Sequence, residues 1–263
     1  MKKEKKQFII SLIAGVLCGA LIVGVVFLFA GLGDDSYEGS GFSEPEDAVI
    51  AYLEALRDCD PEEMRSTFAI ETMIENYDVE AAWYHNGYSA QYYSAYDTIL
   101  LPTDIAFGYD INVERRAAYL TQKIATPFLL AASGAFDDME SHIEELYEKE
   151  PVFASDEDEI EDVLDRYSRS EYEGVLRSLE IVDIYEDPLG NGADSREQKY
   201  LEKLGEIYGA EDVREYVAEL EVDGNDCLFG MIVMCYDGVW YNVKFGSASL
   251  RSQYILDGFT YAE

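Results

Sequence analysis

The chain has 263 residues, 54 of them acidic and 19 basic, and a formal net charge of −35. This balance excludes a nucleic-acid binder, because surfaces that contact phosphates need clustered Lys and Arg. Four Cys are too few for a disulfide scaffold of this length, whereas a hydrophobic content of 48% is enough for a folded core. The sequence carries no recognised catalytic signature.

An uncharged run from Gln7 to Gly33 follows a lysine-rich start and ends before two aspartates. A bilayer core needs roughly 20 apolar residues, so the run is long enough to span one. The lysines orient it by the positive-inside tendency. We therefore expect a cytoplasmic tail at residues 1–7, a transmembrane helix at 8–32 in the lipid bilayer, and an extracytoplasmic remainder in a single-pass cell-membrane protein.

Two other interpretations of this run are a cleaved signal peptide and a lipoprotein signal. The run exceeds the usual length of a signal peptide, and the bulky Leu28 fits a small-residue cleavage site poorly. Lipoprotein signals resemble one another in having a small residue immediately before the lipidated Cys. Here the bulky Leu17 precedes Cys18, which argues against lipidation. Gly15 and Gly19 match the small-xxx-small pattern of associating membrane helices, so they are candidate residues for transmembrane association.

Residues 33–42 predict a flexible tether, because Gly, Ser and Asp there show no apolar period. The folded extracytoplasmic domain is expected at 43–263. Capping boxes at residues 43–46 and 60–63 predict the starts of two helices. Residues 70–177 show mainly helical apolar spacing, with Pro127 predicting a kink or a break.

Beyond Ser178 the apolar period changes to that of strands. Strands are predicted near residues 179–185, 213–222, 227–236 and 239–245, with a helix after Ser195. A turn is predicted at Asp223-Gly224 and a hairpin turn at Asp237-Gly238. Strand 239–245 should place Val239, Tyr241, Val243 and Phe245 on one face. The predicted fold class is α+β: a transmembrane helix, then a mainly helical half packed on a C-terminal antiparallel sheet of about four strands, cone-like.

The opening helix, SEPEDAVIAYLEAL at residues 43–56, resembles that of ketosteroid-isomerase-like (cystatin-like, nuclear-transport-factor-like) cone domains. The helix after Asp60-Pro61 and the closing hairpin Asp237-Gly238-Val239-Trp240-Tyr241 are similar to that family too. The resemblance covers about 43–69 and 178–246, so residues of about 70–177 form a helical insertion. It implies a bacterial surface protein of a kind that often has no assigned activity. Enzymatic members use carboxylates, Tyr or His inside the cone.

Asp183 is the candidate for such an inward carboxylate, because alternation puts it on one strand face with Ile181 and Tyr185. The alternative is a carboxylate at a strand edge, in solvent or paired with Arg. His85 and His142 belong to no metal or triad motif, and neither a metal nor a cofactor is expected.

Aromatic residues recur beside the first of these histidines and could form a platform for sugar rings or for a partner. The default alternative for aromatics at helical spacing is core packing. The candidate ligand-binding residues of this platform are Trp83, Tyr84, Tyr88, Tyr92 and Tyr96.

Cys227 and Cys235 are eight residues apart on one predicted strand, too far to bond each other. Cys59 is the residue with which either of them could form a disulfide. The alternative is that they are buried free thiols. The large negative charge has two possible explanations: it keeps the exposed domain soluble, or it attracts cations or basic partners.

These observations predict a non-enzymatic, membrane-anchored extracytoplasmic binding or accessory module, with an unknown surface protein or wall glycan as partner. One alternative is a small enzyme or small-ligand binder that uses the cone pocket. Another is a cell-wall glycan binder acting through Tyr84 to Tyr96. An inward carboxylate in an enclosed pocket would favour the enzyme. An exposed aromatic strip would favour the glycan binder. A filled cone with an apolar surface patch would favour a protein partner.

Overall fold

The computed structural model describes residues 36–86, 108–139, 169–187, 196–252 and 257–262. Contacts within the chain separate Met1–Ser36 from a compact unit, Tyr37–Glu263. The predicted transmembrane segment 8–32, with Gly15 and Gly19, lies outside the described residues. Among the residues that are described, no helix is long and apolar enough to cross a membrane.

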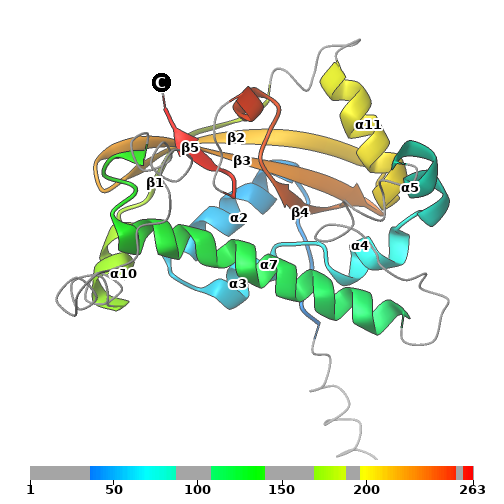
Figure 1. Cartoon of the computed structure of the whole chain (residues 1–263), viewed down its shortest axis with the longest axis horizontal. Helices are drawn as coiled ribbons and strands as arrows, with labels where there is room; N and C mark the ends of the chain where they lie inside the picture. Colours follow the sequence, from blue (N-terminus) through cyan, green and yellow to red (C-terminus); the bar gives the residue numbers. More distant parts are fainter. Residues whose placement is uncertain (1–35, 87–107, 140–168, 188–195, 253–256, 263) are drawn as a thin grey trace, which may run out of the picture. The chain divides into compact units, whose positions relative to one another are not determined.

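The folded unit is an α+β structure, as predicted (Figure 1). Its first half is helical: α2 (Pro45–Arg57), α3 (Pro61–Ser66), α4 (Glu71–Asn76), α5 (Val79–Asn86), α7 (Gly108–Ser133) and α10 (Arg169–Arg177). Its second half holds β1 (Glu180–Glu186), α11 (Arg196–Tyr208), β2 (Asp212–Val222), β3 (Asn225–Tyr236), β4 (Val239–Phe245), the 3-10 helix η2 (Ser249–Ser252) and β5 (Phe259–Tyr261). The antiparallel sheet has the order β1-β2-β3-β4, and β5 pairs with β3.

Local sequence signals account for several of these boundaries. The Asp60 side chain accepts hydrogen bonds from the backbone N–H groups of Glu62 and Glu63, so it caps α3 as predicted. The cap of α2 is Glu44, which makes no side-chain capping bond, so the first predicted capping box does not form. Pro127 does not end its helix, since α7 continues to Ser133.

Two Asp-Gly pairs make the hairpin turns of the sheet. Asp223 and Gly224 have φ angles of 53° and 79°, and Asp237 and Gly238 have φ angles of 50° and 76°. Positive φ at both central residues is the turn geometry that matches the twist of paired strands. The predicted β2–β3 and β3–β4 hairpins are therefore confirmed.

The core lies between the sheet and α2, which crosses one of its faces (Figure 1). Asn242 of β4 donates to the carbonyl of Ala48, 2.6 Å away, and the ring of Tyr52 stacks on Phe229 of β3. On the opposite face, α11 packs against the start of β2, where Gly205 lies next to Val213. We call the side of the sheet that contacts α2 the inner face.

Bulges in the two outer strands change which residues point inward. In β4 the register shifts so that Asn242 pairs with Val233, whereas Lys244 pairs with Ile232. Phe245 pairs with Met231 and therefore lies on the inner face with Asn242, not on the face of Tyr241 as regular alternation predicts. The extra residue is Val243, which a sequence pattern of period two cannot reveal.

Residues 37–42, which we call the strap, lie on the folded unit and not in a free tether. Phe42 forms an antiparallel bridge with Trp240 of β4, and Gly39 donates to the carbonyl of Ser66 at 2.7 Å. The folded unit thus begins at Tyr37, six residues before the predicted start at Ser43. Its hydrogen bonds involve backbone and polar groups, and Tyr37 and Phe42 also pack against the core. Two apolar side chains in six residues form no period, so the sequence did not reveal these contacts.

Candidate functional site

Aromatic rings fill the space between α2 and the inner face, where an enzyme of cone-like fold would place its pocket. Tyr52, Phe68, Phe229 and Phe259 are each fully buried. Tyr52 lies parallel to Phe229 at 5.4 Å between ring centroids and meets Phe68 edge-on at 5.7 Å. Phe245 closes the group, 5.2 Å from the ring of Phe68. The interior of the fold is therefore packed with side chains.

The hydroxyl of Tyr52 is the polar group inside this cluster, and it has no hydrogen-bond partner among the described residues. Burial raises the pKa of Tyr52 well above its ordinary value, and the negative charge of Asp257 adds to the effect. Asp257 is itself held at 2.5 Å by Lys123 and by Thr126, both on α7. The phenol stays neutral at physiological pH and cannot act there as a base.

Asp183 does not point into the interior. A bulge at Val182 shifts the register of β1, so Asp183 pairs with Glu219 on the face opposite α2, whereas Ile181 and Ile184 lie on the inner face. Asp183 is exposed, and its carboxylate accepts a bond from the N–H of Ile184 at 2.9 Å. The hypothesis of an inward carboxylate is wrong, and the alternative of a solvent-exposed position on the outer strand is what the structure shows.

Two members of the predicted aromatic platform are described, both on α5. Trp83 is 44% exposed and Tyr84 is 84% exposed. His85, next in sequence, lies 2.5 Å from Glu206 of α11. Tyr88, Tyr92 and Tyr96 lie outside the described residues, so the platform as a whole, and the glycan binder built on it, stay predictions.

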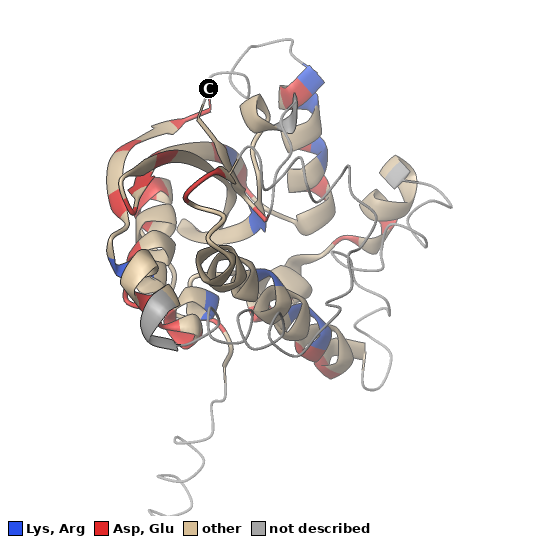
Figure 2. Ribbon diagram, turned by 60° about the vertical axis from the view of Figure 1, so that its left-hand side comes forward, with Lys and Arg blue, Asp and Glu red and all other residues tan. Residues whose placement is uncertain are grey.

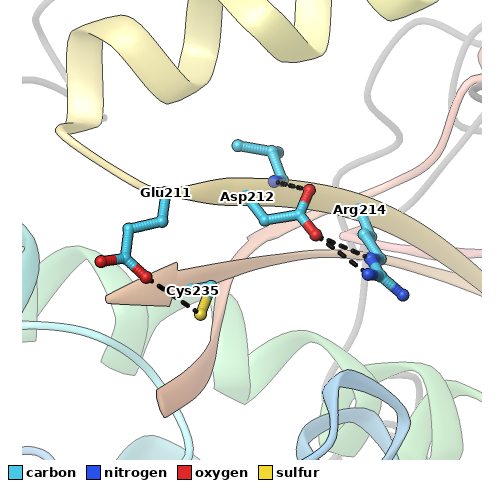
Figure 3. Close-up of polar contacts among 5 residues, drawn as sticks. Glu211, Asp212, Arg214 and Cys235 are labelled. Atoms are coloured by element: carbon cyan, nitrogen blue, oxygen red, sulfur yellow. Dashed lines mark hydrogen bonds and ion pairs between the residues drawn. The ribbon is translucent and has the colours of Figure 1, made fainter. Parts of the chain in front are cut away.

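An acidic groove of about 780 Å³ lies between α11 and the start of β2. Asp212 holds Arg214 through two bonds of 3.0 Å, and the guanidinium of Arg214 also lies 5.1 Å above the ring of Trp240. Figure 3 shows this contact next to Glu211, whose carboxylate is 3.9 Å from the Sγ of Cys235. Five carboxylates line the groove: Glu186, Glu202, Glu206, Glu211 and Asp212.

The chemistry of this groove is that of a solvated acidic surface. Burial raises the pKa of Cys235, and neighbouring carboxylates add to the effect, so its thiol is a poor nucleophile. Within the described part of the chain, no three His, Cys, Asp or Glu side chains are arranged to hold a metal ion. The groove favours positively charged groups and repels anions.

Two buried carboxylates on the outer side of the sheet were missed by sequence reasoning. Glu215 is 2% exposed, and Asp187 is fully buried. Glu215 accepts a bond from the N–H of Ala248 at 3.1 Å, and Asp187 accepts bonds from the N–H and hydroxyl of Ser249 at 2.8 Å. They attach the start of η2 to the sheet, which is a structural role.

An apolar groove of about 560 Å³, here called the α3–α7 groove, opens between α3, α7 and α10. Leu129 on its wall is 53% exposed, and Phe128 meets Tyr172 edge-on at 5.9 Å. Apolar side chains form most of its surface: Pro61, Ile124, Ala125, Phe128, Leu129, Ala132 and Tyr172. Polar residues complete it: Cys59, Glu62, Arg65, Thr121 and Glu173.

Sequence reasoning also missed this groove, because its walls come from three helices far apart in the chain. One local signal pointed to it. Leu129 is apolar but does not belong to the row of buried residues along α7, whereas Ile124 does. An exposed apolar wall of this kind is unusual on a soluble surface and is typical of an interaction site.

Charge is distributed unevenly over the folded unit (Figure 2). Acidic residues occur on nearly every element, whereas α7 and α11 carry many of the basic ones. Lys123 of α7 pairs with Asp257, and the buried Arg116 donates to the carbonyl of Val243 at 2.5 Å. Lys123 and Arg116 of α7 therefore serve internal contacts.

No family model and no curated protein matches this chain. Among solved structures, it is similar to a cystatin-like protein from Ruminococcus gnavus ATCC 29149, with 18% sequence identity and a TM-score of 0.44 over 84% of this chain. The chain spans 45% of that protein's length. The similarity says nothing about activity.

Proposed function

We propose that this chain is a non-enzymatic binding module of a bacterial cell surface, anchored by residues 8–32, whose cone-like extracytoplasmic domain binds a partner protein in the α3–α7 groove. The observation that carries the proposal is the filled interior: the rings of Tyr52, Phe229 and Phe245 occupy the place of a cone pocket. An apolar groove, in contrast, is open on the surface. A partner would then bind on the outer surface of the domain and not in its interior.

The partner's chemistry follows from the walls of the groove and the charge of the chain. Leu129, Phe128 and Tyr172 fit an apolar anchor, such as a Leu or an aromatic side chain of the partner. Glu62 and Glu173 line the same groove, and the chain carries a net charge of −35. A partner segment with basic residues beside its apolar anchor is attracted, and an acidic one is repelled.

Cys59 provides a native reporter for the proposed location, because it is half-buried and lines the groove. Cys227 and Cys235 are buried, and burial raises the pKa of Cys227 to about 12, so both react slowly. We expect a membrane-impermeant maleimide to label Cys59 in intact cells, in a Cys18→Ser background. Labelling that appears only after lysis would place the domain on the cytoplasmic side.

The groove is tested with the substitution Leu129→Asp, and Ile111→Asp serves as its matched control. Ile111 is 44% exposed on the same helix but does not line the groove. Cross-linking in cells identifies a bound protein, whose affinity for each purified variant is then measured. We expect L129D to weaken binding by about tenfold or more, because a charge is placed against an apolar anchor, while I111D binds normally.

The same binding reaction should protect Cys59 from the maleimide, since a partner in the groove covers this thiol. A partner that binds L129D as tightly as the unchanged chain, and leaves Cys59 reactive, contradicts the proposed site.

A further inference from the structure

One acidic side chain makes several of the hydrogen bonds that attach the first half of the strap. The carboxylate of Glu38 accepts bonds from the N–H of Ile70 at 2.6 Å and the N–H of Thr72 at 3.0 Å, and also from the Thr72 hydroxyl. Beside it, the N–H of Tyr37 donates to the carboxylate of Glu71 at 2.8 Å. Three of the hydrogen bonds of the strap thus depend on a single group that can titrate.

At its second half the strap covers the outer edge of β4. Phe42 and Trp240 exchange two backbone bonds, of 2.9 Å and 2.8 Å. Gly41 has a φ angle of +68°, and a Cβ there would lie 2.4 Å from Val239 and 2.6 Å from Tyr241. Glycine is therefore required at this position. The strap pairs with the edge of β4 at Trp240, and residues 67–69 pair with the same edge at Asn242.

The strap also contacts a residue of the α3–α7 groove. The guanidinium carbon of Arg65 lies 5.1 Å from the ring centroid of Tyr37, and Arg65 lines the groove. A cation above an aromatic ring is held in place by the contact. Release of Tyr37 would free the Arg65 side chain to take other positions at the groove.

We propose that the strap is a releasable latch, docked through Glu38 on α4 and through Phe42 on β4, which ties the folded unit to the preceding segment and positions Arg65. Release frees six residues, about 20 Å of extended chain, and unpairs the backbone of Trp240 at the edge of β4. The effect on the α3–α7 groove rests on the proposed function, whereas the latch itself does not. A short segment at the start of the folded unit, held by hydrogen bonds and by the packing of Tyr37 and Phe42, is a natural place for local opening.

Protonation of Glu38 favours the docked state. Burial raises the pKa of Glu38, the bonds from Thr72 and Ile70 oppose the rise, and the nearby charge of Glu71 adds to it. The phenols of Tyr109 on α7, Tyr236 on β3 and Tyr241 on β4 also interact with the charge of Glu38. The guanidinium of Arg65 on α3 lies over the ring of Tyr37, next to Glu38 in the sequence.

The pH dependence of docking has a direction set by the raised pKa of Glu38. A carboxyl whose pKa is higher docked than undocked stabilises docking below its ordinary value of 4.5, and this stabilisation is lost as the pH rises through the docked pKa. Mild acid therefore tightens the latch, and neutral pH loosens it.

Two substitutions of Glu38 separate the loss of its bonds from the loss of its charge. Glu38→Ala removes all three bonds. Glu38→Gln keeps them, because its carbonyl accepts from the two N–H groups and its amide donates to the Thr72 hydroxyl. Glu44→Ala is the matched control, since Glu44 is exposed and makes no capping bond at the start of α2.

Hydrogen exchange of the full chain in detergent micelles measures the protection of the Gly39, Phe42 and Thr72 amides. We expect E38A to lower this protection by about tenfold or more, and E44A to leave it unchanged. In E38Q, protection at neutral pH should equal or exceed that of the unchanged chain and should not vary between pH 5 and 8, once intrinsic exchange rates are divided out.

Equal protection in E38A and the unchanged chain would overturn the latch, and an E38Q strap as open as that of E38A would overturn its control by protonation. Gly41→Ala tests the latch from its other end without changing Glu38, and it should expose Phe42. The exchange rates of the strap amides do not depend on the groove. The latch can therefore fail its test while the groove passes the test with L129D, and the groove can fail while the latch passes.

Discussion

Replacement of Tyr52 by Phe tests whether the interior of the fold is as dry and filled as the ring contacts indicate. The substitution removes the buried hydroxyl and keeps the ring that stacks on Phe229 at 5.4 Å and meets Phe68 and Phe245 edge-on. Because this hydroxyl has no partner among the described residues, its desolvation in the folded state is uncompensated.

The expected effect is a gain of stability. A buried hydroxyl without a partner costs about 1–3 kcal/mol, and the small void left in its place offsets part of that gain. We expect Y52F to raise the free energy of unfolding by about 1 kcal/mol, which corresponds to a rise in Tm of roughly 2–4 °C for a domain of this size.

Tyr236→Phe is the matched control, because the Tyr236 hydroxyl is also buried but donates to the sulfur of Met234 at 3.5 Å. Its removal should lower stability by about 0.5–1 kcal/mol. Urea unfolding of the full chain, followed by tryptophan fluorescence, measures both variants. If Y52F is destabilised as much as Y236F, the Tyr52 hydroxyl has a partner in solution, and a polar site inside the fold returns as the small-ligand alternative.

Two further predictions concern strained turns and thiols. Gly209→Ala should cost about 3 kcal/mol in urea unfolding, because its φ is +65° and a Cβ would lie 2.0 Å from the Asn76 carbonyl, whereas Gly224→Ala, at φ +79° with open space around it, should cost only about 1 kcal/mol. Similar costs at both positions would show that the Asn76 contact yields. In the native chain, a disulfide reagent should modify Cys59 before Cys227, which is 3% exposed, and equal rates would contradict that burial.

Local signals predicted the elements of the fold well. The Asp60 cap depends on bonds within one helical turn, and the Asp223-Gly224 and Asp237-Gly238 turns depend on two residues each. Long-range contacts were not predictable in this way. The strap is held by Glu38, whose partners at Ile70 and Thr72 are more than 30 positions away and leave no period in the sequence.

The candidate sites were predicted less well, because each depends on which side of an element faces another. Alternation placed Asp183 inward, and one extra residue at Val182 reversed it. The α3–α7 groove joins Cys59 to Leu129 and Tyr172, and no motif connects these three positions.

The bulge in β4 decides which side chain closes the interior beside α2. With regular alternation, the inner face would continue from Asn242 to Lys244, and a lysine would end the strand beside α2. The extra residue at Val243 puts Phe245 there, 5.6 Å from the ring of Tyr52, while Lys244 pairs with Ile232 on the other face. A cationic group that could have served a polar pocket is thus exchanged for a ring that closes the core. Under the proposed function, the ligand binds on the outer surface, and the groove that contains Leu129 is the first place to test.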